Sequence, residues 1–223
     1  MNPNSMVFSH QSEIALELAE LFDSVTVFTS ESNASLRPKN VRVVEVPWRR
    51  GSYFGNAVRI IKSILPFLIK NRHSVVFTHM TDIHAALISP FTWLLKMHHV
   101  LWYAHAHNSP YLIWASFFVN RIASSTPGSC NLMINKNKLR LTKQVVSAKH
   151  FLISLREKNS ITKMLNYGRL DPSKNVNRLI ELTELLNGND NSFKLDIYGA
   201  TMSSSSLSYL QFCKTSAEEL IRR

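Results

Sequence analysis

Hydrophobic and polar positions follow one another along the chain in short blocks, and the period within each block indicates a strand or a helix. Val25–Thr29 and Val41–Val46 are short apolar runs rich in β-branched residues, which predicts two buried strands. Glu13–Phe22 and Gly55–Lys70 repeat apolar side chains at helical intervals, which predicts two amphipathic helices. Pro66 is expected to kink the second helix.

The same alternation continues as far as residue 146. It predicts a strand at Ser74–Thr78, a helix at His79–Met97 that Pro90 interrupts, a strand at His99–Ala104, a helix at Pro110–Asn120, and strands at Arg121–Ser125 and Leu139–Val146. Strands that alternate with helices predict an α/β fold with a parallel, doubly wound, Rossmann-like sheet. The polar residues 154–160 predict a linker between an N-terminal domain, residues 1–153, and a second Rossmann-like unit, residues 161–223.

The second unit begins with a strand, a loop, a helix and another strand, and a glycine, Gly168 or Gly199, ends each strand. Ligands of parallel α/β sheets bind beyond the carboxyl ends of the strands. Arg169 and Lys174 flank the turn after the first strand, next to the start of the helix. Two cations beside a helix N-terminus suit an anion such as a diphosphate. A surface loop with two solvated cations has the same pattern, so both interpretations stay open.

The amino-acid sequence of this stretch resembles that of a known protein family. Gly168–Val176, the helix after it and the strand that ends at Gly199 resemble the opening of the C-terminal domain of GT-B glycosyltransferases. The match is to glycosyltransferase family 4, whose retaining enzymes move a sugar from a nucleotide diphosphate sugar. The resemblance implies that Arg169 and Lys174 bind the diphosphate of the donor, in the same motif as Gly168.

The N-terminal part resembles the same family at a lower level. His99–His105 is similar to the strand that ends in a histidine facing the cleft between the two domains, and Ile122–Gly128 is similar to the strand and turn that follow. The resemblance implies that His105 serves the acceptor side of the reaction, with His107 as the alternative match. A structural histidine in the core is the competing interpretation of His105.

The chain also departs from this family in three ways. No clear first strand precedes the helix at Glu13, and no glycine occurs before Gly51. No two glutamates lie eight positions apart, although the family uses such a pair to hold the donor sugar and ribose. Only about 60 residues follow Ile161, whereas a complete domain needs ~100–150. We therefore expect a truncated donor domain, as in a fragment or a split enzyme that a partner chain completes.

The charge of the chain narrows the choice of partners. The formal net charge is +11 and the isoelectric point is about 9.9, which favours anionic membrane surfaces, phosphate-bearing substrates or nucleic acid. The cations are scattered and no nucleic-acid motif occurs, so we do not expect nucleic acid to be the partner. Cys130 and Cys213 lie far apart and predict no disulfide framework, which indicates a reducing cytoplasm. Ala85–Val119 is apolar but broken by proline, lysine and histidine, which predicts core rather than a membrane span.

Several other kinds of chemistry lack support in the sequence. Histidines 98, 99, 105 and 107 suggest a metal site, but no Asp or Glu lies between Asp82 and Glu157, so no metal and no cofactor are expected. The motifs of serine hydrolases, phosphate-loop NTPases and dinucleotide enzymes are absent. The aromatic and basic stretch Trp48–Phe54, with the helix to Lys70, would suit a membrane surface, and equally a loop with an ordinary amphipathic helix.

Taken with the resemblance, these patterns predict that the chain, if the missing donor half completes it, is a retaining hexosyltransferase of polysaccharide or glycolipid biosynthesis. It would transfer a sugar from a nucleotide diphosphate sugar to a polysaccharide or lipid-linked acceptor in the cytoplasm, with peripheral contact at the cytoplasmic membrane face. The alternative is a catalytically inactive remnant that binds an acceptor or a partner protein.

Overall fold

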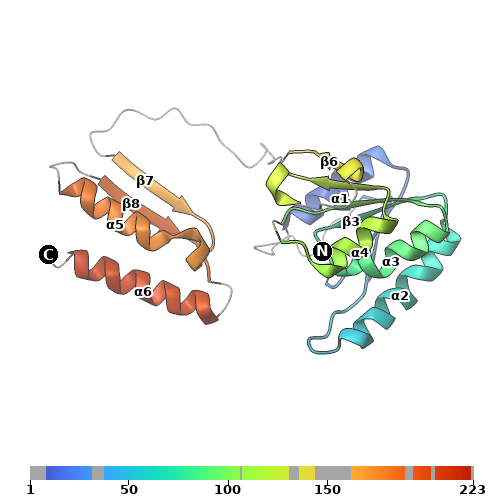
Figure 1. Cartoon of the computed structure of the whole chain (residues 1–223), viewed down its shortest axis with the longest axis horizontal. Helices are drawn as coiled ribbons and strands as arrows, with labels where there is room; N and C mark the ends of the chain where they lie inside the picture. Colours follow the sequence, from blue (N-terminus) through green and yellow to red (C-terminus); the bar gives the residue numbers. More distant parts are fainter. Residues whose placement is uncertain are drawn as a thin grey trace. The chain divides into compact units, whose positions relative to one another are not determined.

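The computed structural model describes residues 9–31, 38–105, 107–130, 136–143, 162–188, 193–201 and 204–221. The chain divides into two compact units, Met1–Ser147 (unit 1) and Ala148–Arg223 (unit 2), which are both drawn in Figure 1. Both units have the α/β organisation with parallel strands that the sequence predicts. The expected linker at residues 154–160 lies outside the described residues.

The strands of unit 1 are all parallel. Strand β1 (Val25–Thr29) pairs with β2 (Val41–Glu45). A second group pairs in chain order: β3 (Val75–His79), β4 (His98–Trp102), β5 (Arg121–Ser124) and β6 (Leu139–Leu141). Within the described residues β1 does not pair with β3, so the described strands of unit 1 form two groups.

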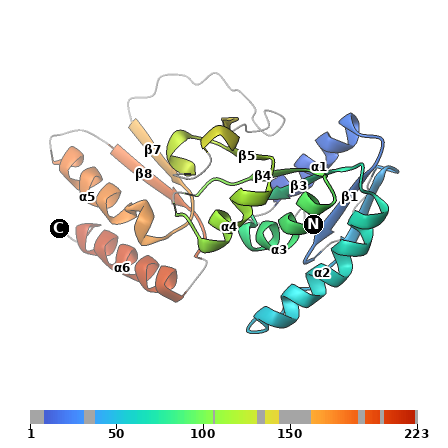
Figure 2. The ribbon, with the colours of Figure 1, turned by 45° about the vertical axis from the view of Figure 1, so that its right-hand side comes forward.

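Four α-helices accompany these strands: α1 (Ser9–Leu21), α2 (Tyr53–Lys70), α3 (Asp82–Leu94) and α4 (Pro110–Phe118). Figure 2 shows that α3 lies between α2 and α4, which places the three helices in one layer. Ile60 and Ile64 of α2 pack with Ile88 of α3 in one core cluster, and Leu112 of α4 packs with Leu101 of β4 in another. Burial of these apolar residues therefore joins the helix layer to both groups of strands.

Three sequence predictions for unit 1 need correction. Pro90 lies inside α3 and does not interrupt it, because the missing hydrogen bond costs less than the helix gains by packing Ala85 and Ile88 into the core. Strand β4 ends at Trp102 rather than Ala104. Strand β6 ends at Leu141, five residues before the predicted end at residue 146, and residues 144–146 lie outside the described part.

Unit 2 has the predicted order of strand, loop, helix and strand. Strand β7 (Thr162–Tyr167) pairs in parallel with β8 (Phe193–Tyr198), and α5 (Val176–Asn187) lies between them in sequence. A short 3-10 turn, Pro172–Lys174, precedes α5, and α6 (Ser204–Ile221) follows β8. Apolar residues of α5 and α6 share one core cluster with β8, so both helices cover the same face of the two strands.

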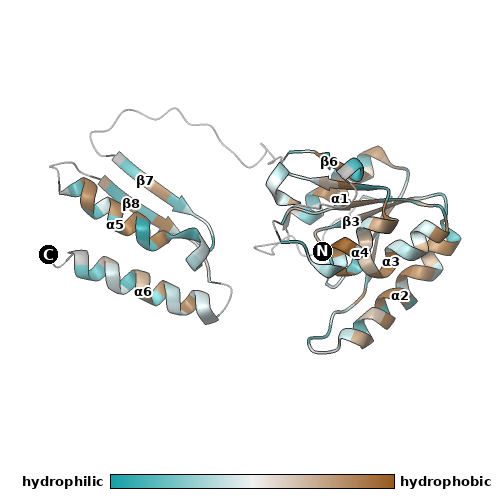
Figure 3. Cartoon of the chain, viewed as in Figure 1, coloured by the Kyte–Doolittle hydropathy of each residue, from teal (hydrophilic) through white to brown (hydrophobic). Residues whose placement is uncertain are grey.

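The two units differ in the hydropathy of their helices. In Figure 3 α4 is largely brown, the colour of hydrophobic residues, whereas α6 is mostly white and teal. No helix within the described residues is both long enough and apolar enough to cross a membrane.

Candidate functional site

The ends of β7 and β8 are held together through their main chains. The N–H of Gly168 donates to the carbonyl of Tyr198 at 3.0 Å, and the N–H of Leu170 donates to the carbonyl of Ala200 at 3.1 Å. A Cβ on Gly199 would lie 1.9 Å from the carbonyl oxygen of Gly168, whereas a Cβ on Gly168 would meet nothing within 4 Å. Gly199 therefore permits the close approach of two backbones, and Gly168 leaves open space beside the loop.

The loop after Gly168 is shaped by Asp171. Its Oδ1 accepts hydrogen bonds from the main-chain N–H and the hydroxyl of Ser173, at 3.0 and 2.7 Å, and its Oδ2 accepts one from Ser206 of α6 at 3.2 Å. The bonds from Ser173 are the main reason why the pKa of Asp171 lies below its ordinary value, and the charge of Arg169 acts in the same direction. The loop ends at Asn175, which has a left-handed backbone conformation at the start of α5.

Arg169 and Lys174 lie on this loop, as predicted, and both side chains are exposed. Within the described part of unit 2, neither the guanidinium of Arg169 nor the ammonium of Lys174 forms a hydrogen bond or an ion pair. Two other cations of unit 2 are engaged, since Arg178 pairs with Glu181 at 2.8 Å and Lys194 lies 3.6 Å from Asp196. The two loop cations are therefore available to an anion.

The start of α5 differs from the sequence prediction of an anion-binding helix N-terminus. The N–H of Asn177 donates to the hydroxyl of Tyr209 at 3.1 Å, and this hydroxyl donates to Oδ1 of Asn177 at 2.8 Å. Burial raises the pKa of Tyr209, which keeps its hydroxyl protonated. The N–H of Arg178 donates to the carbonyl of Asn175 at 3.0 Å. Because these amides already have acceptors, an anion at this loop would be held mainly by Arg169 and Lys174.

In unit 1, His105 and His107 follow the carboxyl end of β4. Both side chains are exposed. The buried Tyr103 holds the loop: its hydroxyl donates to the carbonyl of His107 at 2.7 Å, and its ring packs against that of His105 at 5.5 Å between centroids. Because β4 ends at Trp102, the two histidines do not share a strand face, as the metal hypothesis requires. Within the described residues, no group of three or more His, Cys, Asp and Glu side chains is placed to hold a metal.

His99 is the structural histidine of β4. It is fully buried, with Nδ1 2.9 Å from the hydroxyl of Thr92 and Nε2 3.2 Å from the hydroxyl of Thr78. Burial lowers its pKa to about 4, so the imidazole is neutral at physiological pH. Its role is to join β4 to β3 and α3.

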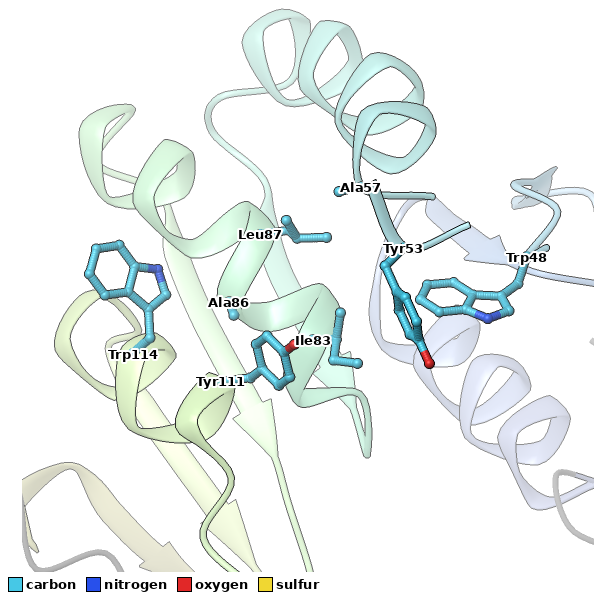
Figure 4. Close-up of a pocket in the computed structure, with 8 residues that line it drawn as sticks. All are labelled: Trp48, Tyr53, Ala57, Ile83, Ala86, Leu87, Tyr111 and Trp114. Carbon is cyan, nitrogen blue, oxygen red and sulfur yellow. The ribbon is translucent and has the colours of Figure 1, made fainter. Parts of the chain in front are cut away.

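A second feature of unit 1 is an apolar pocket, shown in Figure 4, with a volume of about 360 Å³. Four aromatic side chains line it, Trp48, Tyr53, Tyr111 and Trp114, together with aliphatic side chains of α2 and α3. The lining comes from the loop before α2 and from the first turns of α2, α3 and α4. Since these helices follow β2, β3 and β4, the pocket lies at the carboxyl edge of the strands, where ligands of such sheets bind.

Two polar clusters hold the walls of this pocket in place. Asn56 is buried, accepts a hydrogen bond from the N–H of Arg49 at 3.0 Å and donates one to its carbonyl at 2.8 Å, which ties the loop carrying Trp48 to α2. The carboxylate of Asp82 accepts hydrogen bonds from the hydroxyl of Ser109 and from the N–H of Ile83, which joins the starts of α3 and α4.

The sequence predicted part of this arrangement. The motif from Gly168 to Lys174 forms the loop after β7, and His105 and His107 lie beyond the end of β4 rather than directly at it. Tyr209 and Ser206 were missed, because they act on residues more than thirty positions earlier and leave no local pattern. The sequence predicts that Tyr111 and Trp114 belong to an apolar helix and does not indicate that they line a pocket. The one available signal was their place in the first turns after a strand end, next to the aromatic stretch at Trp48.

Comparison with solved structures identifies the fold. The apo form of the lipopolysaccharide outer core galactosyltransferase WaaB aligns with 99% of this chain and 62% of its own, with a TM-score of 0.65 and 12% identity. An α,α-trehalose-phosphate synthase (UDP-forming) from Burkholderia xenovorans, in complex with glucose-6-phosphate, aligns with 99% of this chain and 68% of its own, with a TM-score of 0.63 and 12% identity. The chain thus spans about two thirds of the length of these structures.

These likenesses confirm the predicted α/β fold of the GT-B, Rossmann-like type. At 12% identity they concern the fold alone. No protein-family model matches the chain, and a search of curated proteins finds no match either.

Proposed function

We propose that the chain belongs to a retaining glycosyltransferase of the family 4 type. Its substrates are a nucleotide diphosphate sugar and a polysaccharide or lipid-linked acceptor. The observation that carries this proposal is the loop after β7, where Arg169 and Lys174 extend into solvent beside the open space at Gly168. The GT-B fold supports it, because both solved structures described above share that architecture.

The proposed role of each residue follows from the charge that moves in the reaction. When the bond between the sugar and the diphosphate breaks, the negative charge on the leaving diphosphate grows. Arg169 and Lys174 stabilise this charge, and the missing side chain at Gly168 lets a phosphate approach the main chain. His105, exposed at the end of β4 and held by Tyr103, serves the acceptor side. No resident cofactor or metal takes part in these roles.

The diphosphate site is tested by calorimetric titration of the chain with UDP and GDP. Each charge-assisted hydrogen bond contributes about 1.5–3 kcal/mol, so the double variant R169A/K174A should bind at least about tenfold more weakly. The matched control is R178A/K194A, which removes the same charge from unit 2 but leaves the loop intact. The control should stay within about threefold of wild type.

Two outcomes would contradict this site. If a folded wild-type chain binds neither UDP nor GDP, the proposed diphosphate site is contradicted. Equal losses of affinity in both double variants would mean that UDP and GDP binding depends only on the total positive charge of unit 2. His105→Ala is expected to leave the affinity for UDP unchanged, because His105 is proposed to act on the acceptor.

We also propose that the protein works at the cytoplasmic face of a membrane, in peripheral contact. Two cysteines in 223 residues provide no disulfide framework, which supports a reducing compartment. Tyr53 and Phe54, at the start of α2, are 75% and 84% exposed and follow the cations Arg49 and Arg50. Aromatic rings beside cations are typical of surfaces that lie against anionic lipids.

A partner chain for unit 2 is the last part of the proposal. Leu165 and Tyr167 of β7 are 68% and 85% exposed, on strands whose other face is covered by α5 and α6. An exposed apolar sheet face supports a polypeptide partner. Leu165→Glu should reduce association of the chain in sedimentation velocity experiments, and unchanged sedimentation would count against this face.

A further inference from the structure

The apolar pocket of unit 1 has a composition that selects its ligand. Its lining combines four aromatic rings with the aliphatic side chains of Ile83 and Leu87, and none of the lining residues is charged. A volume of about 360 Å³ lies in the lower part of the range of ~300–1,000 Å³ for small-molecule sites. A sugar or a nucleotide would leave most of its polar groups without partners on these walls, which is costly. A hydrocarbon chain would leave none.

The residues next to the pocket lining in sequence are cationic rather than apolar. Arg49 and Arg50 lie exposed between the lining residues Trp48 and Tyr53 in sequence. Asp82 is the only acidic residue between Glu45 and Glu157. Its carboxylate already accepts hydrogen bonds from Ser109 and from the N–H of Ile83. The exposed segment between Trp48 and Tyr53 is therefore cationic, which complements an amphiphile with an anionic head.

The pocket is also built before any ligand binds. Asn56 fixes the loop at Arg49 through two hydrogen bonds, and the ring of Trp48 packs against His84 at 5.8 Å between centroids. Burial lowers the pKa of His84, against the opposing charge of Asp82, so this imidazole adds no charge to the wall. Binding would therefore not require the loop to become ordered, and less conformational entropy would be lost.

We infer that this pocket binds the hydrocarbon chain of a lipid phosphate, with the phosphate beside Arg49 and Arg50. The pocket lies at the carboxyl edge of the strands, where ligands of such sheets bind. The bound lipid phosphate would therefore be the lipid part of the acceptor substrate. The inference rests on the proposed function, because only that function makes the bound lipid phosphate an acceptor. It thereby selects a lipid-linked acceptor over a free polysaccharide.

A chain-length series tests the pocket directly. The probes are n-hexyl and n-octyl phosphate below their micellar concentrations, with inorganic phosphate as the head group alone. Trp48 and Trp114 line the pocket, so binding should change tryptophan fluorescence and saturate. Each buried methylene should tighten binding roughly fourfold, hence about fifteenfold between the two alkyl phosphates. Inorganic phosphate should produce no saturable change.

Two tryptophans provide a matched pair of variants. Trp114 of α4 lines the pocket and is 51% exposed, whereas Trp93 of α3 lies outside the lining and is 62% exposed. The rings of both pack against Phe118. Trp114→Ala should weaken octyl phosphate binding about tenfold, and Trp93→Ala should leave it within about twofold. Ala57→Leu, which fills the pocket from α2, should remove the dependence on chain length.

Several results would overturn the inference. They are equal affinities for the two alkyl phosphates, equal losses in Trp114→Ala and Trp93→Ala, binding of a methyl glycoside without an alkyl chain, or binding only to anionic vesicles. Unchanged melting temperatures of the variants exclude misfolding as the cause. UDP binding depends on unit 2, so its loss would contradict the proposed function and leave the alkyl phosphate result standing. Failure of alkyl phosphate binding alone would contradict only the pocket.

Discussion

In unit 1 buried polar side chains fix the loop after β2 and the strand β4, whereas in unit 2 the main chain and the carboxylate of Asp171 fix the loops after the strands. Asn56 and His99 make their hydrogen bonds inside unit 1, away from solvent. In unit 2 Gly199 allows two backbones to touch, and Asp171 orders the next turn. The loops at the carboxyl edge of the sheet are thus stabilised in a different way in each unit.

This difference bears on what each edge can bind. Unit 1 uses its polar groups internally and presents aromatic rings to the pocket, which suits a hydrocarbon chain. Unit 2 leaves the charges of Arg169 and Lys174 in solvent, which suits an anion. A donor with a diphosphate and an acceptor with a lipid anchor would therefore each find the surface that matches them.

The units can be followed separately in solution. All four tryptophans, at positions 48, 93, 102 and 114, lie in unit 1. Each unit also contains one buried cysteine, Cys130 in unit 1 and Cys213 in unit 2. Tryptophan fluorescence reports unfolding of unit 1, and the rate of thiol labelling at each cysteine reports opening of its own unit.

The largest effect is expected from Gly199→Val, which should break unit 2 and spare unit 1. Its Cβ would lie 1.9 Å from a main-chain oxygen of Gly168, which cannot move without displacing β7. The free energy of unfolding of unit 2 should fall by more than about 3 kcal/mol, the upper end of overpacking costs. Labelling of Cys213 should accelerate strongly, while labelling of Cys130 and the fluorescence transition stay unchanged.

Gly168→Ala is the matched control, because open space surrounds a Cβ at that position. It should change the stability of unit 2 by less than about 1 kcal/mol. Similar losses in the two glycine variants would contradict the close approach of the strand-end loops.

The second prediction concerns acid sensitivity of unit 1. Burial lowers the pKa of His99 from 6.5 to about 4, so the unfolded chain binds a proton at this site more readily than the folded one. This contribution to stability is unaffected above pH 6.5 and is lost as the pH falls from 6.5 towards 4, by about 3 kcal/mol in total. Melting temperatures followed by tryptophan fluorescence should show this loss.

His99→Gln should flatten that pH dependence, although the variant is less stable at neutral pH. His98, its exposed neighbour on β4, gives the control His98→Gln, which should keep the wild-type slope. An unchanged slope in His99→Gln would mean that another group causes the acid sensitivity of unit 1.

The sequence was sufficient to predict most of the strands and helices. Val25–Thr29 is a strand with the predicted bounds, because a short β-branched run has few alternatives between two turns. Pro90 was judged wrongly, since the effect of a proline depends on the packing of its helix, which one sequence does not reveal.

The two candidate sites also differ in how far the sequence alone predicts them. The loop from Gly168 to Lys174 is continuous in sequence, so its two cations can be proposed from the sequence alone. The pocket joins Trp48, Tyr53 and Trp114 from three separate segments, so no local pattern shows it. Tyr209 reaches Asn177 across 32 positions, and only the fold reveals that it occupies the start of α5.

The third prediction tests the buried polar support of the pocket. Asn56→Ala removes both hydrogen bonds to the main chain of Arg49, and also the contact at 2.6 Å from Arg59. Leaving these groups unsatisfied should lower the stability of unit 1 by about 2 kcal/mol. It should also weaken octyl phosphate binding, because the loop that carries Trp48 loses its anchor. Fluorescence-detected denaturation and titration measure the two effects.

Asn71→Ala provides the comparison, because Asn71 lies at the other end of α2 and caps the carbonyl of Phe67 at 2.8 Å. It should cost less than about 1 kcal/mol and leave octyl phosphate binding unchanged. Weaker binding in both variants would mean that the pocket responds to the stability of α2 as a whole.

The smallest effect is expected from Asp171→Asn, at the exposed support of unit 2. Hydrogen bonds from Ser173 hold the pKa of Asp171 below 3.8, so its contribution to stability is present above pH 3.8 and is lost as the pH falls below it. The variant should open more readily than wild type at neutral pH, seen as faster labelling of Cys213, and this difference should shrink in acid. Since His99 acts between pH 6.5 and 4, unit 1 should lose stability on acidification before unit 2 does. The reverse order, with Cys213 exposed before the tryptophan signal changes, would break the contrast between a buried polar support and an exposed one.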